Sequence, residues 1–163
     1  MLTGKSRLLL GLTAAAPLLF AACTDNSILN PMANAAGTYQ LTVYAGRTPP
    51  ATYTIQPNDP TYGSIAPNGG TLVVTDGTLA LNNDGTFVET NNYTVTPSGG
   101  SASQYQFLSS GTWTLNGTTF TLSDPSRNRY VTGTLQADLN NNLTVNYTEN
   151  DGTGTFQPYE YKR

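Results

Sequence analysis

Alternation of apolar and polar residues is the feature that most limits what this chain can fold into. Tyr39 and Leu41 alternate with glutamine and threonine, and Leu143 and Val145 alternate with threonine and asparagine. A period of two places the apolar side chains on one face of a strand and the polar ones on the other. Parallel strands, which are covered on both faces, would instead read as continuous apolar runs. The pattern over residues 37–163 therefore predicts half-buried antiparallel strands.

Asp-Gly and Asn-Gly pairs punctuate this pattern. They stand at Asp76-Gly77, Asp84-Gly85, Asn116-Gly117 and Asp151-Gly152. Because these residues tolerate positive φ, such pairs suit two-residue hairpins. The sequence therefore predicts four hairpins and an up-and-down order of strands.

About eight to eleven strands are expected between residues 37 and 163, since the candidates at 104–108 and 112–115 can merge into one. An up-and-down sheet leaves two edges exposed unless its first and last strands pair. We therefore predict a single all-β domain, an antiparallel up-and-down barrel or half-barrel. The expected interior comprises Tyr39, Leu41, Val43, Leu79, Leu81, Phe87, Trp113, Leu115, Phe120, Leu122, Val131, Leu135, Leu143, Val145 and Tyr147.

The first 22 residues have the composition of an export signal. Lys5 and Arg7 occur without any acid, and a mostly apolar stretch follows over residues 8–20. This stretch is too short to span a bilayer as a helix. Residues 1–22 are therefore predicted to be a signal peptide.

The single cysteine, Cys23, comes directly after this segment. The sequence Phe20-Ala21-Ala22-Cys23 resembles the lipobox of bacterial lipoproteins, in which small residues precede the cysteine that receives a diacylglyceryl thioether before cleavage. The resemblance implies lipidation of Cys23. The alternative is an ordinary signal peptide, cleaved after Ala22, that leaves Cys23 as a free thiol.

Residues 23–36 would then be a lipidated tether, and their last 13 residues reach at most about 43 Å when fully extended. The membrane, reached through the lipid anchor, is the expected partner. Thr24 follows Cys23, so the acidic residue that retains lipoproteins at the inner membrane is absent from that position. The expected location is the bacterial cell envelope, at the outer membrane, facing the periplasm or the cell surface.

Composition excludes most familiar active sites. The chain has no His and one Cys, so Ser-His-Asp triads, His-ligated zinc and disulfide frameworks cannot be built from it. Acid–base chemistry would fall to scattered carboxylates and tyrosines, so we expect no enzyme, no catalytic residues and no cofactor. Nucleic acid is not an expected partner, because the basic side chains beyond residue 22 are few and scattered. They are Arg47, Arg127, Arg129, Lys162 and Arg163.

Three segments look like small bacterial lipoproteins that carry a lipocalin-like domain. They are Gly37-Thr38-Tyr39, the hairpin at 79–87, and Gly111-Thr112-Trp113 followed by residues 120–124. The likeness covers most of residues 37–163 and implies a lipocalin-like barrel. It places Tyr39 where lipocalins proper have a Trp near the barrel base. The family has no settled activity, so a role as a ligand carrier follows only by analogy of fold.

Glu89 differs from the other carboxylates. Five aspartates, which are Asp76, Asp84, Asp124, Asp138 and Asp151, fall in predicted turns, where Asp hydrogen-bonds its own backbone. Glu89 shares the inward face of its strand with Phe87 and Tyr93. An inward Glu in an apolar barrel either recognises a ligand through a polar contact or pairs with Arg127 or Arg129. Alternatively, a twist or bulge of the strand leaves it in solvent.

Residues 138–149 have the ligand spacing of an EF-hand calcium loop. However, Leu143 occupies the position that requires Gly, and the flanking segments read as strands. An Asn-rich hairpin turn explains the same residues, so no metal site is expected.

Aromatic side chains are numerous for a chain of this size. They could either fill the barrel interior or line a ligand-binding cavity, and each arrangement implies a different function. Small barrels fill their interiors with such side chains, whereas wider ones line a ligand cup. The expected function is an envelope-anchored lipoprotein that binds a small apolar ligand. The alternative is a structural or interaction lipoprotein with a filled barrel and no ligand. The proline-rich residues 46–70 are expected at the rim, and the candidate ligand-binding residues are Tyr39, Phe87, Glu89, Tyr93, Trp113 and Phe120.

Overall fold

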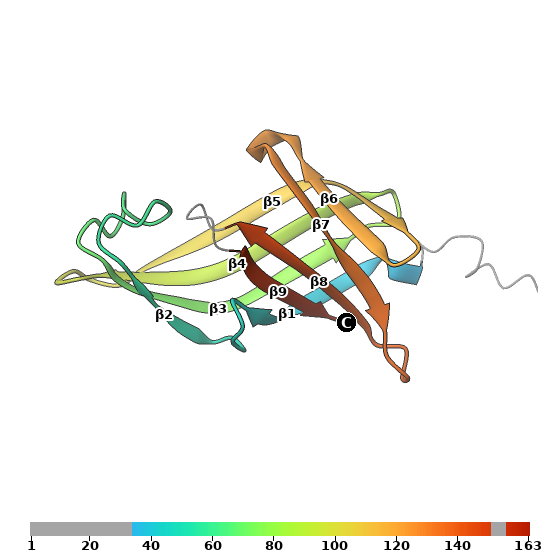
Figure 1. Cartoon of the computed structure of the whole chain (residues 1–163), viewed down its shortest axis with the longest axis horizontal. Helices are drawn as coiled ribbons and strands as arrows, with labels where there is room; N and C mark the ends of the chain where they lie inside the picture. Colours follow the sequence, from blue (N-terminus) through green and yellow to red (C-terminus); the bar gives the residue numbers. More distant parts are fainter. Residues whose placement is uncertain (1–33, 151–155) are drawn as a thin grey trace, which may run out of the picture.

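The computed structural model of the chain describes residues 34–150 and 156–163, which form an all-β fold (Figure 1). The predicted signal peptide at 1–22, the Cys23 lipidation site, most of the tether and the turn at Asp151-Gly152 lie outside the described residues. No helix within the described ranges could span a membrane.

The described residues contain nine strands and one 3-10 turn, and the strand count agrees with the prediction. In chain order they are β1 Gly37–Tyr44, β2 Ala51–Ile55, β3 Gly70–Leu81, β4 Thr86–Pro97, β5 Ser103–Asn116, β6 Thr119–Asp124, η1 Pro125–Arg127, β7 Arg129–Ala137, β8 Leu143–Asn150 and β9 Phe156–Lys162.

Eight of these strands close an antiparallel barrel. β1 pairs with β9, so the expected pairing of the first and last strands is confirmed. Every consecutive pair from β3 to β9 is antiparallel. The two candidates at 104–108 and 112–115, whose merger the sequence left open, form the single long strand β5.

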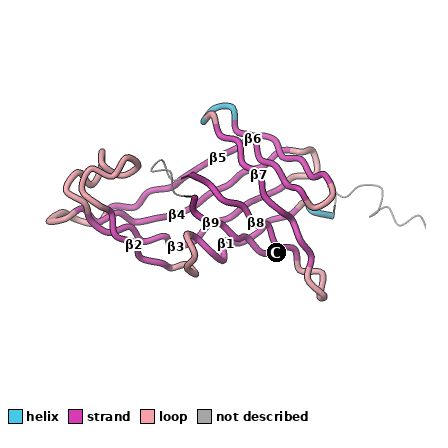
Figure 2. Tube along the Cα trace, viewed as in Figure 1, coloured by secondary structure: helices cyan, strands magenta, loops and turns pink. Residues whose placement is uncertain are grey.

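β2 lies outside the closed ring and extends one wall of it. β3 is long enough to hold two strands end to end on one edge: residues 78–81 pair with β1, and residues 70–74 pair with β2. Together with the long strands β4 and β5, β2 continues past the barrel at the left of Figure 1. The loops at that end include the long β2–β3 connection (Figure 2). The barrel therefore has one tall wall, and this wall stands at its open end.

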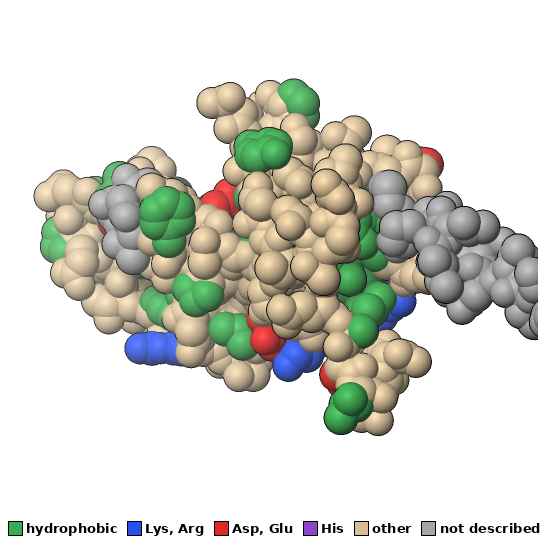
Figure 3. Space-filling view, turned by 45° about the vertical axis from the view of Figure 1, so that its right-hand side comes forward, with side chains coloured by type: hydrophobic (Ala, Val, Ile, Leu, Met, Phe, Trp, Pro, Cys, Tyr) green, Lys and Arg blue, Asp and Glu red, His purple; other side chains and the backbone are tan. Residues whose placement is uncertain are grey.

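The predicted faces hold along almost every strand. All but three of the predicted interior residues are buried; Leu115 and Leu143 are half-buried against the core. The prediction that Val43 is buried was wrong, because β1 has a bulge between Leu41 and Val43. The bulge turns the next inward position over to Tyr44, which packs against the core in place of Val43. The outer face in Figure 3 is mostly uncharged, with acidic and basic side chains in small separate groups.

The Asp-Gly pair at residue 76 is not a hairpin turn, contrary to the prediction. It lies inside β3, just after a bulge between Val74 and Asp76. Gly77 is buried there, and a Cβ added to it would lie 2.0 Å from the Asn91 side-chain oxygen. Close approach of a neighbouring side chain, rather than positive φ, explains this glycine. The hairpins at Gly85 and Gly117 are confirmed, with φ of 82° and 60°.

One end of the barrel is filled with apolar side chains. Tyr39, Phe87, Trp113 and Phe120 are all buried there, and the Trp113 and Phe120 rings lie 6.4 Å apart. The Trp113 indole N–H donates to the Asn82 carbonyl at 2.9 Å, which satisfies its polar atom. Tyr39 thus lies buried at the filled end of the barrel.

Both ends of the described chain are held at this filled end (Figure 1). Arg163 near the C-terminus donates hydrogen bonds to the carbonyls of Asn34 and Ala36. Its guanidinium also lies 5.4 Å from the centre of the Tyr39 ring. The chain therefore enters the barrel at the end opposite to the open one.

Replacing Gly77 by Val is expected to lower the free energy of unfolding by about 1–3 kcal/mol, because the added carbons must displace the Asn91 side chain. Urea unfolding monitored by Trp113 fluorescence measures the effect. Thr71→Val, at an exposed position of the same strand, is the control and should change stability little. Equal stability of Gly77→Val and the parent chain would contradict the packing described here.

Candidate ligand-binding site

A cavity of about 560 Å³ occupies the open end of the barrel. Its position follows from the alternation, since inward residues on each strand pass from the filled end to the mouth in order. On β4 this order is Phe87, Glu89, Asn91 and Tyr93. The cavity is lined by Tyr44, Thr61, Tyr62, Ser64, Ile65, Val74, Asn91, Tyr93, Tyr105, Phe107, Glu149, Asn150, Gln157 and Tyr159.

Tyrosine rings form one wall of the cavity from β1 and β9. The Tyr44 ring meets Tyr159 edge to face at a centroid distance of 5.0 Å. Tyr159 in turn stacks on Tyr147 of β8 at 4.8 Å. Such contacts fix ring positions, so this wall is rigid before any ligand arrives.

A second aromatic group comes from β4, β5 and the β2–β3 loop. Tyr93 stacks on Tyr105 at 5.7 Å, and Tyr62 meets Tyr93 edge to face at 6.2 Å. The Asp59 carboxylate holds the loop, since it accepts the backbone N–H groups of Thr61 and Tyr62 at 2.9 and 3.0 Å. Burial raises the pKa of Tyr62 and of Tyr93, so both hydroxyls are neutral at pH 7.

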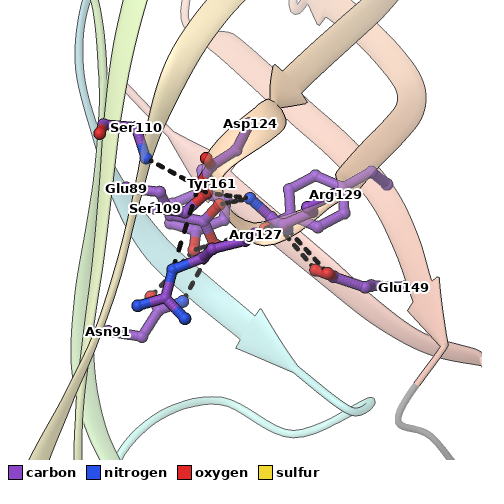
Figure 4. Close-up of polar contacts among 10 residues, drawn as sticks. Glu89, Asn91, Ser109, Ser110, Asp124, Arg127, Arg129, Glu149 and Tyr161 are labelled. Atoms are coloured by element: carbon purple, nitrogen blue, oxygen red, sulfur yellow. Dashed lines mark hydrogen bonds and ion pairs between the residues drawn. The ribbon is translucent and has the colours of Figure 1, made fainter.

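A layer of polar side chains separates the cavity from the filled end; we call it the polar layer (Figure 4). Its centre is Glu89, which is fully buried. One carboxylate oxygen, Oε1, accepts the hydroxyls of Tyr147 and Tyr161 at 2.6 and 2.8 Å and the Asn91 amide at 3.0 Å. The other members of the layer are Ser109, Asp124 and Arg129, which join it from β5, β6 and β7.

Arg129 joins the polar layer to the cavity. Its Nη1 lies 2.8 Å from Oε2 of Glu89, and it also donates to Ser109 Oγ at 3.0 Å. On its other side, Nε and Nη2 each donate to the Glu149 carboxylate at 2.7 Å. Glu149 lines the cavity, and its side chain is 27% exposed. One guanidinium therefore bridges a buried carboxylate and a carboxylate that is open to the cavity.

Burial and neighbouring charges keep the two tyrosines and the arginine of the polar layer in fixed protonation states. Burial raises the pKa of Tyr147 and Tyr161 well above the usual range, so both remain donors to Glu89. Burial alone would lower the pKa of Arg129, but hydrogen bonds to Glu149 and the charge of Glu89 outweigh it and raise that pKa. Arg129 is therefore charged at any pH at which the domain is folded.

Asp124 completes the polar layer and ends β6. Its Oδ2 accepts Ser109 Oγ at 2.8 Å and the Ser110 N–H at 3.2 Å, while Oδ1 caps η1 through Ser126. Burial would raise the pKa of this carboxyl, but the hydrogen bonds from Ser126 and Ser109 outweigh it and lower the pKa to about 2. The predicted turn role of Asp124 is thus accompanied by a contact across strands to β5.

The structure separates the six candidate ligand-binding residues into three groups. Only Tyr93 lines the cavity. Glu89 lies directly beneath it, and its inward orientation and its pairing with Arg129, rather than Arg127, settle the alternatives left open by the sequence. Tyr39, Phe87, Trp113 and Phe120 are packed in the filled end and are not among the lining residues.

Several lining residues were not anticipated from the sequence. Tyr105 and Phe107 share the inward face of β5 with Trp113, so alternation and distance from the hairpin could have identified them. Tyr44 was hidden by the β1 bulge. Tyr62 lies in a loop and carries no periodic signal.

The residues with EF-hand spacing form a hairpin turn. Asp138 accepts the backbone N–H groups of Asn140 and Asn142 at 2.7 and 2.9 Å, which is the Asn-rich turn expected from the sequence. Across the described ranges there is no group of three or more side chains able to hold a metal ion.

Comparison of the chain with protein-family models, curated proteins and solved structures finds no match. The fold and the cavity therefore define the protein class by themselves: a small antiparallel barrel, filled at one end and hollow at the other.

The Glu89–Arg129 pair is expected to contribute strongly to stability. Arg129→Met should lower the free energy of unfolding by about 3–5 kcal/mol, because it leaves the Glu89 charge buried without a cationic partner. Glu89→Leu should lower it by about 1–3 kcal/mol, because Arg129 keeps Glu149 as a partner while the Tyr147 and Tyr161 hydroxyls lose their acceptor on Glu89. The double variant should be more stable than the sum of the two changes implies, by about 1–3 kcal/mol. Urea unfolding of all four chains measures this coupling.

The surface pair Glu160–Lys162, with N···O at 2.9 Å, is the control for these variants, and the Lys162 side chain is 52% exposed. Lys162→Gln should change stability by less than about 1 kcal/mol, because water screens the charge of an exposed lysine. Strict additivity of the Glu89 and Arg129 changes would show that the two side chains do not interact as described.

Proposed function

We propose that this chain is an envelope-anchored lipoprotein whose lipocalin-like barrel binds a small, largely apolar molecule in the open-end cavity. The observation that carries the proposal is the cavity itself. Its volume of about 560 Å³ falls within the range of about 300–1,000 Å³ typical of small-molecule sites. Eight of its fourteen lining residues are aromatic or aliphatic, and predominantly apolar walls with interspersed polar groups are also typical of such sites.

The arrangement of the barrel argues for ligand binding over the purely structural alternative. A structural barrel gains stability by filling its interior, as this one does around Trp113 and Phe120. At the open end, large rings such as Tyr93 and Tyr105 instead stand beside empty space. These rings contact one another but leave the space beside them unfilled. This arrangement favours a ligand-binding site.

Lipid attachment at Cys23 would tether the barrel from its filled end. Residues 34–36 are bound by Arg163 at that end. A chain anchored through Cys23 would therefore be attached at the end opposite to the mouth, through a tether of at most about 43 Å. Attachment at that end leaves the mouth free to capture a molecule from the aqueous side of the membrane.

The lipoprotein part of the proposal predicts a diacylglyceryl group on the Cys23 sulfur in the mature chain. Mass spectrometry of the protein expressed in a bacterium with a lipoprotein-processing pathway measures it. Cys23→Ser should abolish both the added lipid mass and the membrane association. An unmodified Cys23 thiol at the mature N-terminus would reject lipidation and leave the binding proposal to be judged by itself.

The binding part predicts that the full chain takes up the neutral fluorescent probe N-phenyl-1-naphthylamine and that filling the cavity prevents it. Val74→Trp points a large ring into the cavity and should weaken binding by about tenfold or more. The matched control is Val73→Trp, which adds the same ring to the opposite face of β3. Cys23→Ser in every chain keeps lipid out of the measurement.

Thermal unfolding of both tryptophan variants checks that each is folded at the assay temperature. Equal probe binding by folded Val74→Trp and Val73→Trp chains would contradict a site in the cavity. Absence of probe binding by the parent chain would favour the structural alternative.

A further inference from the structure

The charge that faces the cavity is negative. Glu149 is the one charged side chain among the described residues that line it. Both of its oxygens accept from Arg129, but a carboxylate offers about four lone-pair positions, so acceptor capacity remains on the cavity side.

The negative charge is not cancelled by the groups around it. Arg129 is shared between Glu89 and Glu149, so three charged groups carry a formal net charge of −1. The neighbouring charges, Arg127 and Asp124, offset each other across 4.0 Å and leave this total unchanged. Because Glu89 is fully buried and Arg129 is 7% exposed, water screens this excess charge poorly.

The aromatic walls of the cavity also favour a positively charged ligand. Ring faces carry negative potential, so tyrosine and phenylalanine rings around a cavity attract cations. Phe107 already does so within the protein, since the guanidinium groups of Arg127 and Arg129 lie 5.1 and 5.4 Å from its ring centre. Tyr44, Tyr93, Tyr105 and Tyr159 provide further rings around the same space.

We propose that the ligand of this cavity is a cation: an amine or quaternary ammonium group on an apolar body, with the positive charge placed beside Glu149. This inference rests on the proposed function and names the ligand class for that same site. The cation would supply the positive charge that the Glu89–Arg129–Glu149 group lacks. Its apolar body would contact the tyrosine rings.

An anionic ligand, such as a fatty acid, fits these residues poorly. Its carboxylate would face Glu149, and the Arg129 donors that point toward the cavity are already taken by Glu149 at 2.7 Å. Arg127 is more exposed, at 48% of its side chain, but it is not among the residues lining this cavity. A fatty acid would have to break the Arg129–Glu149 pair to gain a cationic partner.

Three probes with straight ten-carbon chains test the proposal: decyltrimethylammonium, decanol and decanoate, in which the tenth carbon is the carboxylate. Each competes with N-phenyl-1-naphthylamine for the full chain carrying Cys23→Ser, at pH 7, low salt and below its micelle-forming concentration. We expect decyltrimethylammonium to bind about tenfold more tightly than decanol, and decanoate to bind most weakly.

Glu149→Gln keeps the shape of the side chain and removes its charge, so it should remove most of the preference for the cation while decanol binds as before. The control is Glu160→Gln, since Glu160 pairs with Lys162 and is not a lining residue; the preference should persist in this variant.

The outcomes separate the two proposals. Binding of all three probes with decanoate equal to or tighter than decyltrimethylammonium would overturn the cation inference and leave the binding function intact. A cation preference that survives Glu149→Gln would likewise overturn the role given to Glu149. Failure of all three probes and of N-phenyl-1-naphthylamine to bind would overturn the proposed function and the inference with it.

Discussion

The buried ion pair between Glu89 and Arg129 is the interaction on which the arrangement of this barrel depends. It joins β4 to β7, two strands that are not neighbours in the sheet. Desolvating two charges costs more than their attraction returns unless further hydrogen bonds satisfy them. Here Tyr147, Tyr161 and Asn91 supply those bonds. A polar group of this kind cannot pack against aliphatic carbon on all sides, so the polar layer interrupts the apolar core, which resumes beyond Tyr93 at Val95 of β4.

The two halves of the barrel consequently differ in how densely they are packed. The filled half buries large side chains around Trp113 and Phe120 and also holds both ends of the described chain. The open half leaves volume unfilled, which is costly where it removes contacts from a core. Most of the largest fully buried side chains lie in the filled half, so the unfilled volume lies away from the most densely packed part of the barrel.

Much of the fold could be predicted from the sequence, because period-two alternation fixes which residues share a face whatever the pairing partner is. The failures have local causes. Bulges in β1 and β3 displaced Val43 and turned the Asp76-Gly77 pair into strand, and a bulge leaves no mark in the alternation that precedes it. The site was harder to predict from the sequence. Alternation shows that Phe87, Glu89 and Tyr93 point inward, but it does not show which positions along the barrel axis are packed and which border the cavity. That boundary depends on Arg129 reaching Glu89 from a distant strand.

NMR of the isotope-labelled full chain carrying Cys23→Ser, titrated with decanol, tests most directly whether the polar layer separates a filled end from a cavity that binds ligand. Ring signals of Tyr93, Tyr105 and Phe107 are expected to shift, while the indole N–H of Trp113, the single tryptophan, stays in place. A shift of the Trp113 signal equal to those of the cavity tyrosines would show that ligand enters the filled end and would contradict binding above the polar layer.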